Sequence, residues 1–139
     1  MKVILKDKNH YILRFDRGEE VTEGLKNFCQ EEKIAAGYFS GLGAVSEITL
    51  SYFNYSTKKY EDKNIKDDLE AVSFTGNVSI IDGDVIIHAH GAFGDSKLAV
   101  LGGHVKKMAV LVTAEIHLQA FEGKIERILD ERTGLNLME

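Results

Sequence analysis

The segment from Ile80 to Val105, IIDGDVIIHAHGAFGDSKLAVLGGHV, decides the fold and holds three of the five histidines, His88, His90 and His104. His88 and His90 lie two residues apart in an apolar run. Alternate residues of a β-strand point to the same face, so a strand here places both imidazoles on one face. The polar stretch Gly94–Lys97 is typical of a turn, and a second apolar run follows it. We therefore predict a β-hairpin.

The length of the hairpin loop decides where His104 points. With a three-residue loop at Asp95–Lys97, His104 lies directly across from His88 on the same face, whereas a two-residue loop sends His104 to the other face. The first register gathers three imidazoles, and neutral imidazole is the commonest protein ligand for transition metals. We therefore expect His88, His90 and His104 to bind zinc or another divalent transition metal. The alternative is that they are polar side chains on a solvated face.

Length and composition restrict the class of protein. The chain has 139 residues, enough for one domain with its own core, and we take residues 1–139 as that domain. A net charge of −5 argues against nucleic-acid binding by the isolated chain, because such proteins carry a basic surface. No apolar run approaches the ~20 residues that cross a membrane, and the N-terminus lacks a signal-peptide apolar region. We expect a cytoplasmic protein, with the single Cys29 a small buried hydrophobic residue rather than a nucleophile.

One helix and a series of strands are predicted for the rest of the chain. Val21, Leu25 and Phe28 recur at helical spacing and predict a principal helix over Glu19–Lys33. Outside the hairpin, alternating or continuous apolar runs predict strands at Tyr11–Asp16, Ile34–Phe39, Val45–Tyr55, Leu69–Ile81, Met108–Phe121 and Lys124–Leu129. This order predicts an α+β fold with a mainly antiparallel β-sheet.

The connections between these strands carry further expectations. Ser40–Gly43 is glycine-rich and is predicted to be a tight connection between strands, while Thr57–Asp68 is predicted to be a polar interruption with a short strand and an exposed loop. The tail after Leu129 is expected to fray. The chain has no proline to guard its edge strands, so we expect subunits to cover them in a homo-oligomer.

Several short motifs, taken in this order, resemble the PPC domain, which is conserved between plants and prokaryotes. They are Leu13-Arg14-Phe15 with Gly18-Glu19, Ser40–Val45, Ser73–Gly76, His88-Ala89-His90 with Asp95, Leu101–His104, and Thr113–Glu115. The resemblance covers Tyr11 to about Leu135. It implies an antiparallel α+β fold, a homotrimer and, in prokaryotic members that keep the histidines, a metal, usually zinc, on His88, His90 and His104.

The family is commonly called DNA-binding, and in plant nuclear proteins the domain is fused to AT-hooks. This chain has no AT-hook, because the Arg-Gly-Arg-Pro core is absent and the sequence contains no proline. Its segment Asp67–Val72 also carries an acidic residue where plant members carry an arginine. Both departures argue against direct DNA binding by this chain.

The three histidines leave two functions open. One is a metal-binding domain that acts by binding a small molecule or a partner protein. The other is a zinc-dependent, hydrolase-type enzyme, because three histidine ligands leave the fourth tetrahedral position for a water whose pKa zinc lowers. No catalytic residue is identified, but Glu115, Glu19 and Asp95 are candidate acids or bases. Glu115 is alternatively a hydrogen-bond partner of a ligand histidine, and Arg14 either holds an anionic ligand or forms a surface ion pair.

Overall fold

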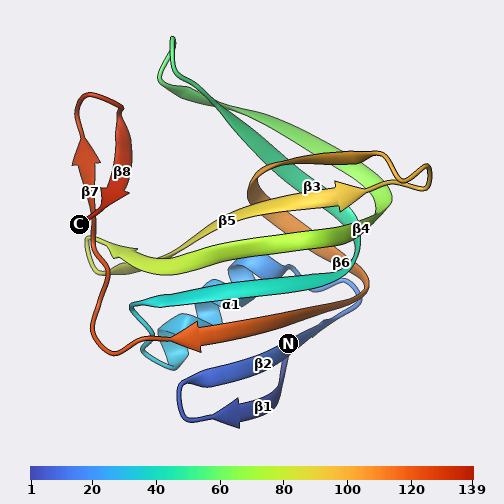
Figure 1. The fold of residues 1–139 in the computed structure, drawn as a ribbon, viewed down its shortest axis with the longest axis horizontal. Coiled ribbons are helices and arrows are strands. Elements are labelled where there is room, and N and C mark those ends of the chain that lie inside the picture. The colour runs from blue at the N-terminus through green and yellow to red at the C-terminus, as the bar shows by residue number, and fades with distance from the viewer.

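A curved six-stranded antiparallel sheet carries the fold, with one helix against its concave side (Figure 1). The computed structural model describes residues 1–139. Its elements are β1 (Lys2–Asp7), β2 (His10–Asp16), α1 (Val21–Glu31), β3 (Gly37–Asn54), β4 (Lys59–Ile81), β5 (Asp84–Gly94), β6 (Val100–Ala120), β7 (Arg127–Asp130) and β8 (Leu135–Met138). The expected α+β fold with a mainly antiparallel sheet and one principal helix is confirmed.

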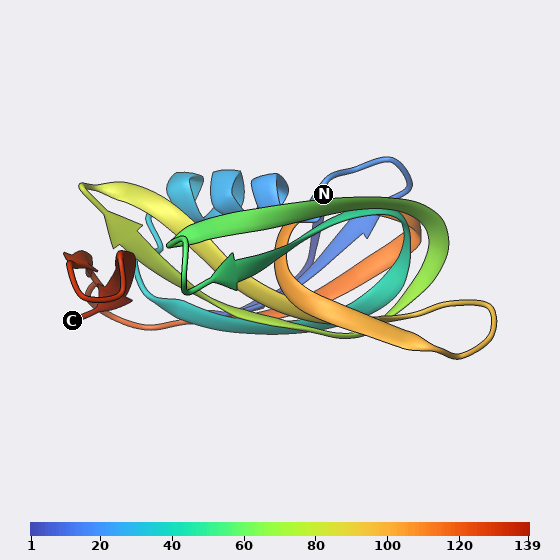
Figure 2. The ribbon, with the colours of Figure 1, turned by 90° about the horizontal axis from the view of Figure 1, so that it is seen from above.

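The sheet closes on itself at one end. Its strand order is β1-β2-β6-β3-β4-β5, and β5 also pairs with β6. The four strands from β3 to β6 therefore form a closed ring. Figure 2 shows this ring as seen from above. β7 and β8 form a separate two-stranded hairpin beside the far end of β4 and β5 (Figure 1).

The helix is shorter than predicted because both of its ends are fixed locally. Glu20 caps its N-terminus by accepting hydrogen bonds from the backbone N–H groups of Thr22 and Glu23. Lys33, with a φ of 57°, adopts the left-handed conformation that ends a helix. Cys29 is buried, and burial raises the pKa of its thiol to about 12. It therefore packs as a hydrophobic residue, as expected.

The glycine-rich segment Ser40–Gly43 is not a turn, contrary to the prediction, but part of β3. The pairing of β3 with β4 and β6 shifts register at Gly41 and Gly43, so the strand bulges there instead of ending. A Cβ atom at Gly43 would collide with the backbone of Thr113 on β6. Glycine is needed here for the close approach of two strands.

The polar segment Thr57–Asp68 is likewise not an exposed loop for most of its length, because β4 starts at Lys59. The hairpin formed by β3 and β4 projects from the body of the molecule, at the top of Figure 1. The side chains of Lys59–Lys66 are almost all exposed there, which explains their polar composition without a break in the strand.

Two strands at the ends of the chain differ from the sequence prediction. β1 was not predicted, because all six of its residues are exposed and it only extends the sheet edge beside β2. The tail does not fray, since β8 pairs with β7 through a turn in which Asp130 accepts hydrogen bonds from Thr133. The final predicted strand begins at Arg127 rather than Lys124. The helix α1 is neither long nor apolar enough to cross a membrane.

Candidate metal centre

His90 and His104 face each other across the pairing of β5 with β6. Gly94 pairs with Val100, so the hairpin loop has five residues, and the predicted three-residue loop with His88 opposite His104 is wrong. The carboxylate of Asp95 fixes this longer loop by accepting hydrogen bonds from Lys97 N at 2.8 Å and Ala99 N at 2.9 Å. Because the loop is longer by two residues, the period of two is preserved, and His104 stays on the predicted face.

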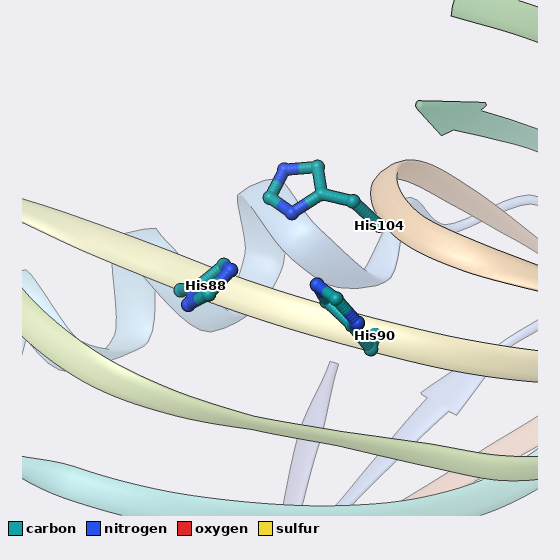
Figure 3. A group of neighbouring side chains, drawn as sticks. All are labelled: His88, His90 and His104. Atoms are coloured by element: carbon teal, nitrogen blue, oxygen red, sulfur yellow. The ribbon is translucent and has the colours of Figure 1, made fainter. Parts of the chain in front are cut away.

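The three imidazole rings form one cluster. Their centroids are 5.1 Å apart for His88 and His104, 5.3 Å for His88 and His90, and 5.5 Å for His90 and His104. One nitrogen of each ring lies within 4.8 Å of the corresponding nitrogens of the other two. Figure 3 shows the rings turned toward a common point between β5 and β6. The nitrogens of a tetrahedral zinc site, with bonds of about 2.0–2.1 Å, lie roughly 3.4 Å apart, so the rings must turn inward to hold one ion.

The surroundings keep two of these rings in the neutral form that binds metals. Burial, with the positive charge of Arg127, lowers the pKa of His88 to about 4. Burial also lowers the pKa of His104. The Nδ1 atom of His104 is buried and has no hydrogen-bond partner, which is unusual for a buried polar atom and leaves this nitrogen free for a metal ion. The donor set, its protonation and this unpaired atom fit a divalent transition metal.

Arg127, the first residue of β7, contacts the cluster and was not predicted from the sequence. Its Nη2 lies 3.1 Å from Nδ1 of His88 and 3.0 Å from Oδ1 of Asn77, while Nε donates to Oγ of Ser79 at 2.8 Å. A guanidinium only donates, so in this arrangement Nδ1 of His88 is the acceptor and its proton lies on Nε2. Metal binding by His88 therefore requires that this contact break, which frees a lone pair on one of its nitrogens. Arg127 is held beside the histidines because the residues before it pair with β4. Ile80 N donates to the carbonyl oxygen of Ile125, which brings the start of β7 alongside β4.

A pocket of about 320 Å³ adjoins the cluster. His88, His104 and Arg127 line it together with apolar side chains of β4, β5 and the β7–β8 hairpin. Tyr60 also lines the pocket, and its ring lies 5.3 Å from that of His104. Tyr60 was missed because it belongs to the segment Thr57–Asp68, which was predicted to be a polar interruption with a short strand and an exposed loop.

The other predicted site residues lie away from the pocket beside the histidines. Asp95 caps the hairpin loop. Arg14 pairs with Asp16 at 3.1 Å, so it forms the surface ion pair that was the alternative to binding an anionic ligand. Arg14 also lies across from Glu115 in the pairing of β2 with β6. Glu19 accepts hydrogen bonds from the N-terminal amino group and from Asp16 N. None of these four side chains lines the pocket beside the three histidines.

The carboxylate that does act on the cluster is Asp62. It partly offsets the lowering of the His104 pKa, and its own pKa is lowered by hydrogen bonds from Lys106 and Ser51. These bonds are 2.7 Å and 2.6 Å long. Asp62 also lies in the segment Thr57–Asp68, which was predicted to be a polar interruption.

Fold and cluster together define an antiparallel α+β domain with three histidines arranged as metal ligands. The family model of the Plants and Prokaryotes Conserved (PCC) domain matches residues 4–122. The chain belongs to this family, which is the PPC domain whose motifs the sequence resembles.

Solved structures with the same fold cover nearly the whole chain. A PPC protein from Pyrococcus horikoshii is 37% identical, with a TM-score of 0.88 over 94% of this chain and 90% of its own. A candidate DNA-binding protein from Bacteroides thetaiotaomicron is 32% identical, with a TM-score of 0.94 over 97% and 94%. A metal-containing protein from Archaeoglobus fulgidus is 31% identical, with a TM-score of 0.87 over 100% and 99%. No curated protein matches the chain.

Proposed function

We propose that this PPC-domain protein binds a divalent transition metal, zinc in the first place, through His88, His90 and His104, and takes a small ligand at that site. The observation that carries this proposal is the convergence of three ring nitrogens within 4.8 Å of one another. The neutral state of the buried rings and the unpaired Nδ1 of His104 support it. The similar Archaeoglobus fulgidus protein is metal-containing, which supports it independently.

Cobalt(II) titration tests this proposal spectroscopically. Chelator-treated protein is titrated with cobalt(II), and we expect the intense visible absorption of a four-coordinate site to saturate at one ion per chain. His104→Ala should abolish this band. His117→Ala is the matched control, because His117 lies on β6 outside the cluster and should leave the band unchanged. Weak six-coordinate absorption, or equal spectra for wild type and His104→Ala, would refute the proposal.

We also propose that the protein assembles as a homotrimer. Leu42, Val72 and Val112 lie on the neighbouring strands β3, β4 and β6, and 57%, 59% and 65% of their respective surfaces are exposed. Exposed aliphatic side chains on adjacent strands are typical of a subunit contact. Light scattering should give three times the chain mass of 15.5 kDa, and Leu42→Asp should lower it. A monomer mass for the wild type would exclude the trimer.

A zinc-dependent hydrolase is the second candidate, because the pocket brings space for a substrate to His88 and His104. Such an enzyme needs a general base, and Asp62 is the carboxylate whose charge reaches His104. Activity of the zinc-loaded protein on a panel of esters and amides that disappears in both His104→Ala and Asp62→Asn would support this candidate. Activity that survives either substitution would exclude it.

Direct DNA binding is not part of the proposed function. The chain carries a net charge of −5 and no AT-hook, although similar proteins are candidate DNA-binding proteins. A gel shift at physiological salt should therefore show no complex, and a complex that weakens steeply with added salt would contradict this view.

We further propose the cytoplasm as the compartment, in keeping with a single buried cysteine that forms no disulfide.

A further inference from the structure

The pocket beside the three histidines has a mixed wall that fits a small organic ligand. Ile81 and Ile86 line it on the side of β4 and β5, and Leu135 and Leu137 line it on the side of the C-terminal hairpin. His88 and His104 bring the metal-binding nitrogens to the same space. Its volume of about 320 Å³ is at the lower end of the ~300–1,000 Å³ of ligand sites. A ligand of this pocket is therefore small and partly apolar.

Arg127 is the only permanently charged side chain that lines this pocket, and it has no acidic partner. It donates to four neutral acceptors, namely Oγ of Ser79, Oδ1 of Asn77, the carbonyl oxygen of Asn136 and Nδ1 of His88. A guanidinium has five N–H groups, so these bonds leave one N–H of Nη1 unused. A half-buried arginine without a carboxylate partner is a site for an anion, which the remaining N–H can hold through one charge-assisted hydrogen bond.

The charge of the pocket points the same way. Imidazole ligands do not neutralise a divalent ion, and no Asp or Glu lines the pocket. Asp62, whose charge reaches His104, is itself paired with Lys106. A bound metal would therefore add to the positive charge of Arg127. An anion balances this charge, and a single arginine set among apolar walls suits one carboxylate on an apolar body better than a phosphate, which needs more donors.

We propose that this pocket binds a small monocarboxylate with a compact apolar body, and that Arg127 holds its carboxylate group. The proposal rests on the proposed function, because the metal is the second positive centre of the same pocket. Arg127 lies beyond residues 4–122, the part of the chain matched by the family model. The ligand selectivity would thus come from the C-terminal hairpin, which lies outside the matched residues, together with the three histidines inside them.

Calorimetric titration with isobutyrate tests the proposal on zinc-loaded protein. We expect isobutyrate to bind, and its neutral amide, isobutyramide, and inorganic phosphate to bind at least tenfold more weakly. Arg127→Gln should weaken isobutyrate binding roughly ten- to a hundredfold, as for loss of a hydrogen bond to a charged group. Arg127→Lys should keep part of the affinity, which guards against a folding defect of the Gln variant. Arg132→Gln, a change of an exposed arginine of the same hairpin that does not line the pocket, should have no effect.

The same samples separate this proposal from the metal proposal. Zinc content is measured in each variant, and we expect Arg127→Gln to keep its zinc while losing isobutyrate. If isobutyrate shifts the Arg127 Nε–H resonance of a protein that takes no metal, the metal proposal fails and the carboxylate site stands. Isobutyrate bound equally by wild type and Arg127→Gln, isobutyramide bound as tightly as isobutyrate, or no binding of isobutyrate at millimolar concentrations would each overturn the carboxylate site.

Discussion

His90 lies directly across from His104 in the antiparallel pairing of β5 with β6, and their ring centroids are 5.5 Å apart. This pair closes the ring of strands, and the period of two along β5 adds His88 on the same face. The cluster therefore depends on the register of one hairpin, which its five-residue loop sets. Side chains that fix this loop are expected to influence both stability and metal affinity.

Asp95→Ala tests this dependence on the loop. The substitution removes the acceptor of two backbone hydrogen bonds, from Lys97 N and Ala99 N. We expect the free energy of unfolding in urea to fall by about 1–2 kcal/mol and the zinc affinity to weaken. Ser96→Ala, in the same exposed loop, is the control and should change neither quantity. Equal zinc affinity for Asp95→Ala and wild type would show that the loop does not set the geometry of the cluster.

Stability of the metal-free protein should fall on mild acidification. The pKa of His88 is lowered from 6.5 to about 4, so between these values the unfolded chain binds a proton that the folded protein does not. The folded protein is therefore most stable above pH 6.5, where His88 is neutral in both states. It loses stability as the pH falls from 6.5 toward about 4, because the proton that the unfolded chain takes up favours unfolding. Between pH 7 and pH 5 we expect a loss of roughly 1–2 kcal/mol from this ring, which water partly reaches.

Urea unfolding of the chelated protein across this pH range measures that loss. His88→Gln, which keeps a hydrogen-bond acceptor for Arg127, should show a distinctly flatter profile. A profile of the same slope in both proteins would mean that His88 is not held neutral by the fold.

Gly43 should be intolerant of any side chain. A Cβ atom there would meet backbone atoms of β6, including Cα of Ala114 at 2.7 Å, and backbone cannot move aside as a flexible side chain can. We expect Gly43→Ala to lower the free energy of unfolding by about 1–3 kcal/mol. Gly94→Ala is the control, because the nearest atom to its Cβ would be 3.9 Å away. Similar melting temperatures for the two variants would contradict the close strand approach.

Strands in which buried and exposed residues alternate along the chain could be predicted from the sequence. Tyr11, Leu13 and Phe15 are buried on one face of β2, and His88 and His90 share a face of β5, as a period of two requires. The face of His104 was also predicted, although the loop that places it was not. The long strands β3 and β4 were predicted in pieces, because glycine bulges and an exposed polar stretch look like interruptions when only neighbouring residues are considered.

The rest of the site comes from contacts between distant parts of the chain. Arg127 reaches His88 because the segment before β7 lies alongside Ile80, and Tyr60 reaches His104 because β4 returns beside β3. No periodicity within the sequence carries this information. The carboxylates that were chosen from the sequence were plausible by type, but Asp95 is fixed by the hairpin loop, Glu19 is bound to the N-terminal amino group, and Glu115 does not line the pocket.

The metal content of protein purified without a histidine tag tests the central claim most directly. Wild type and His117→Ala should carry one divalent transition metal ion per chain by elemental analysis, and His104→Ala should carry almost none, because two imidazoles bind a metal far less tightly than three. Wild-type protein that holds no metal and gains no thermal stability on addition of zinc, or His104→Ala protein with an undiminished metal content, would contradict the account.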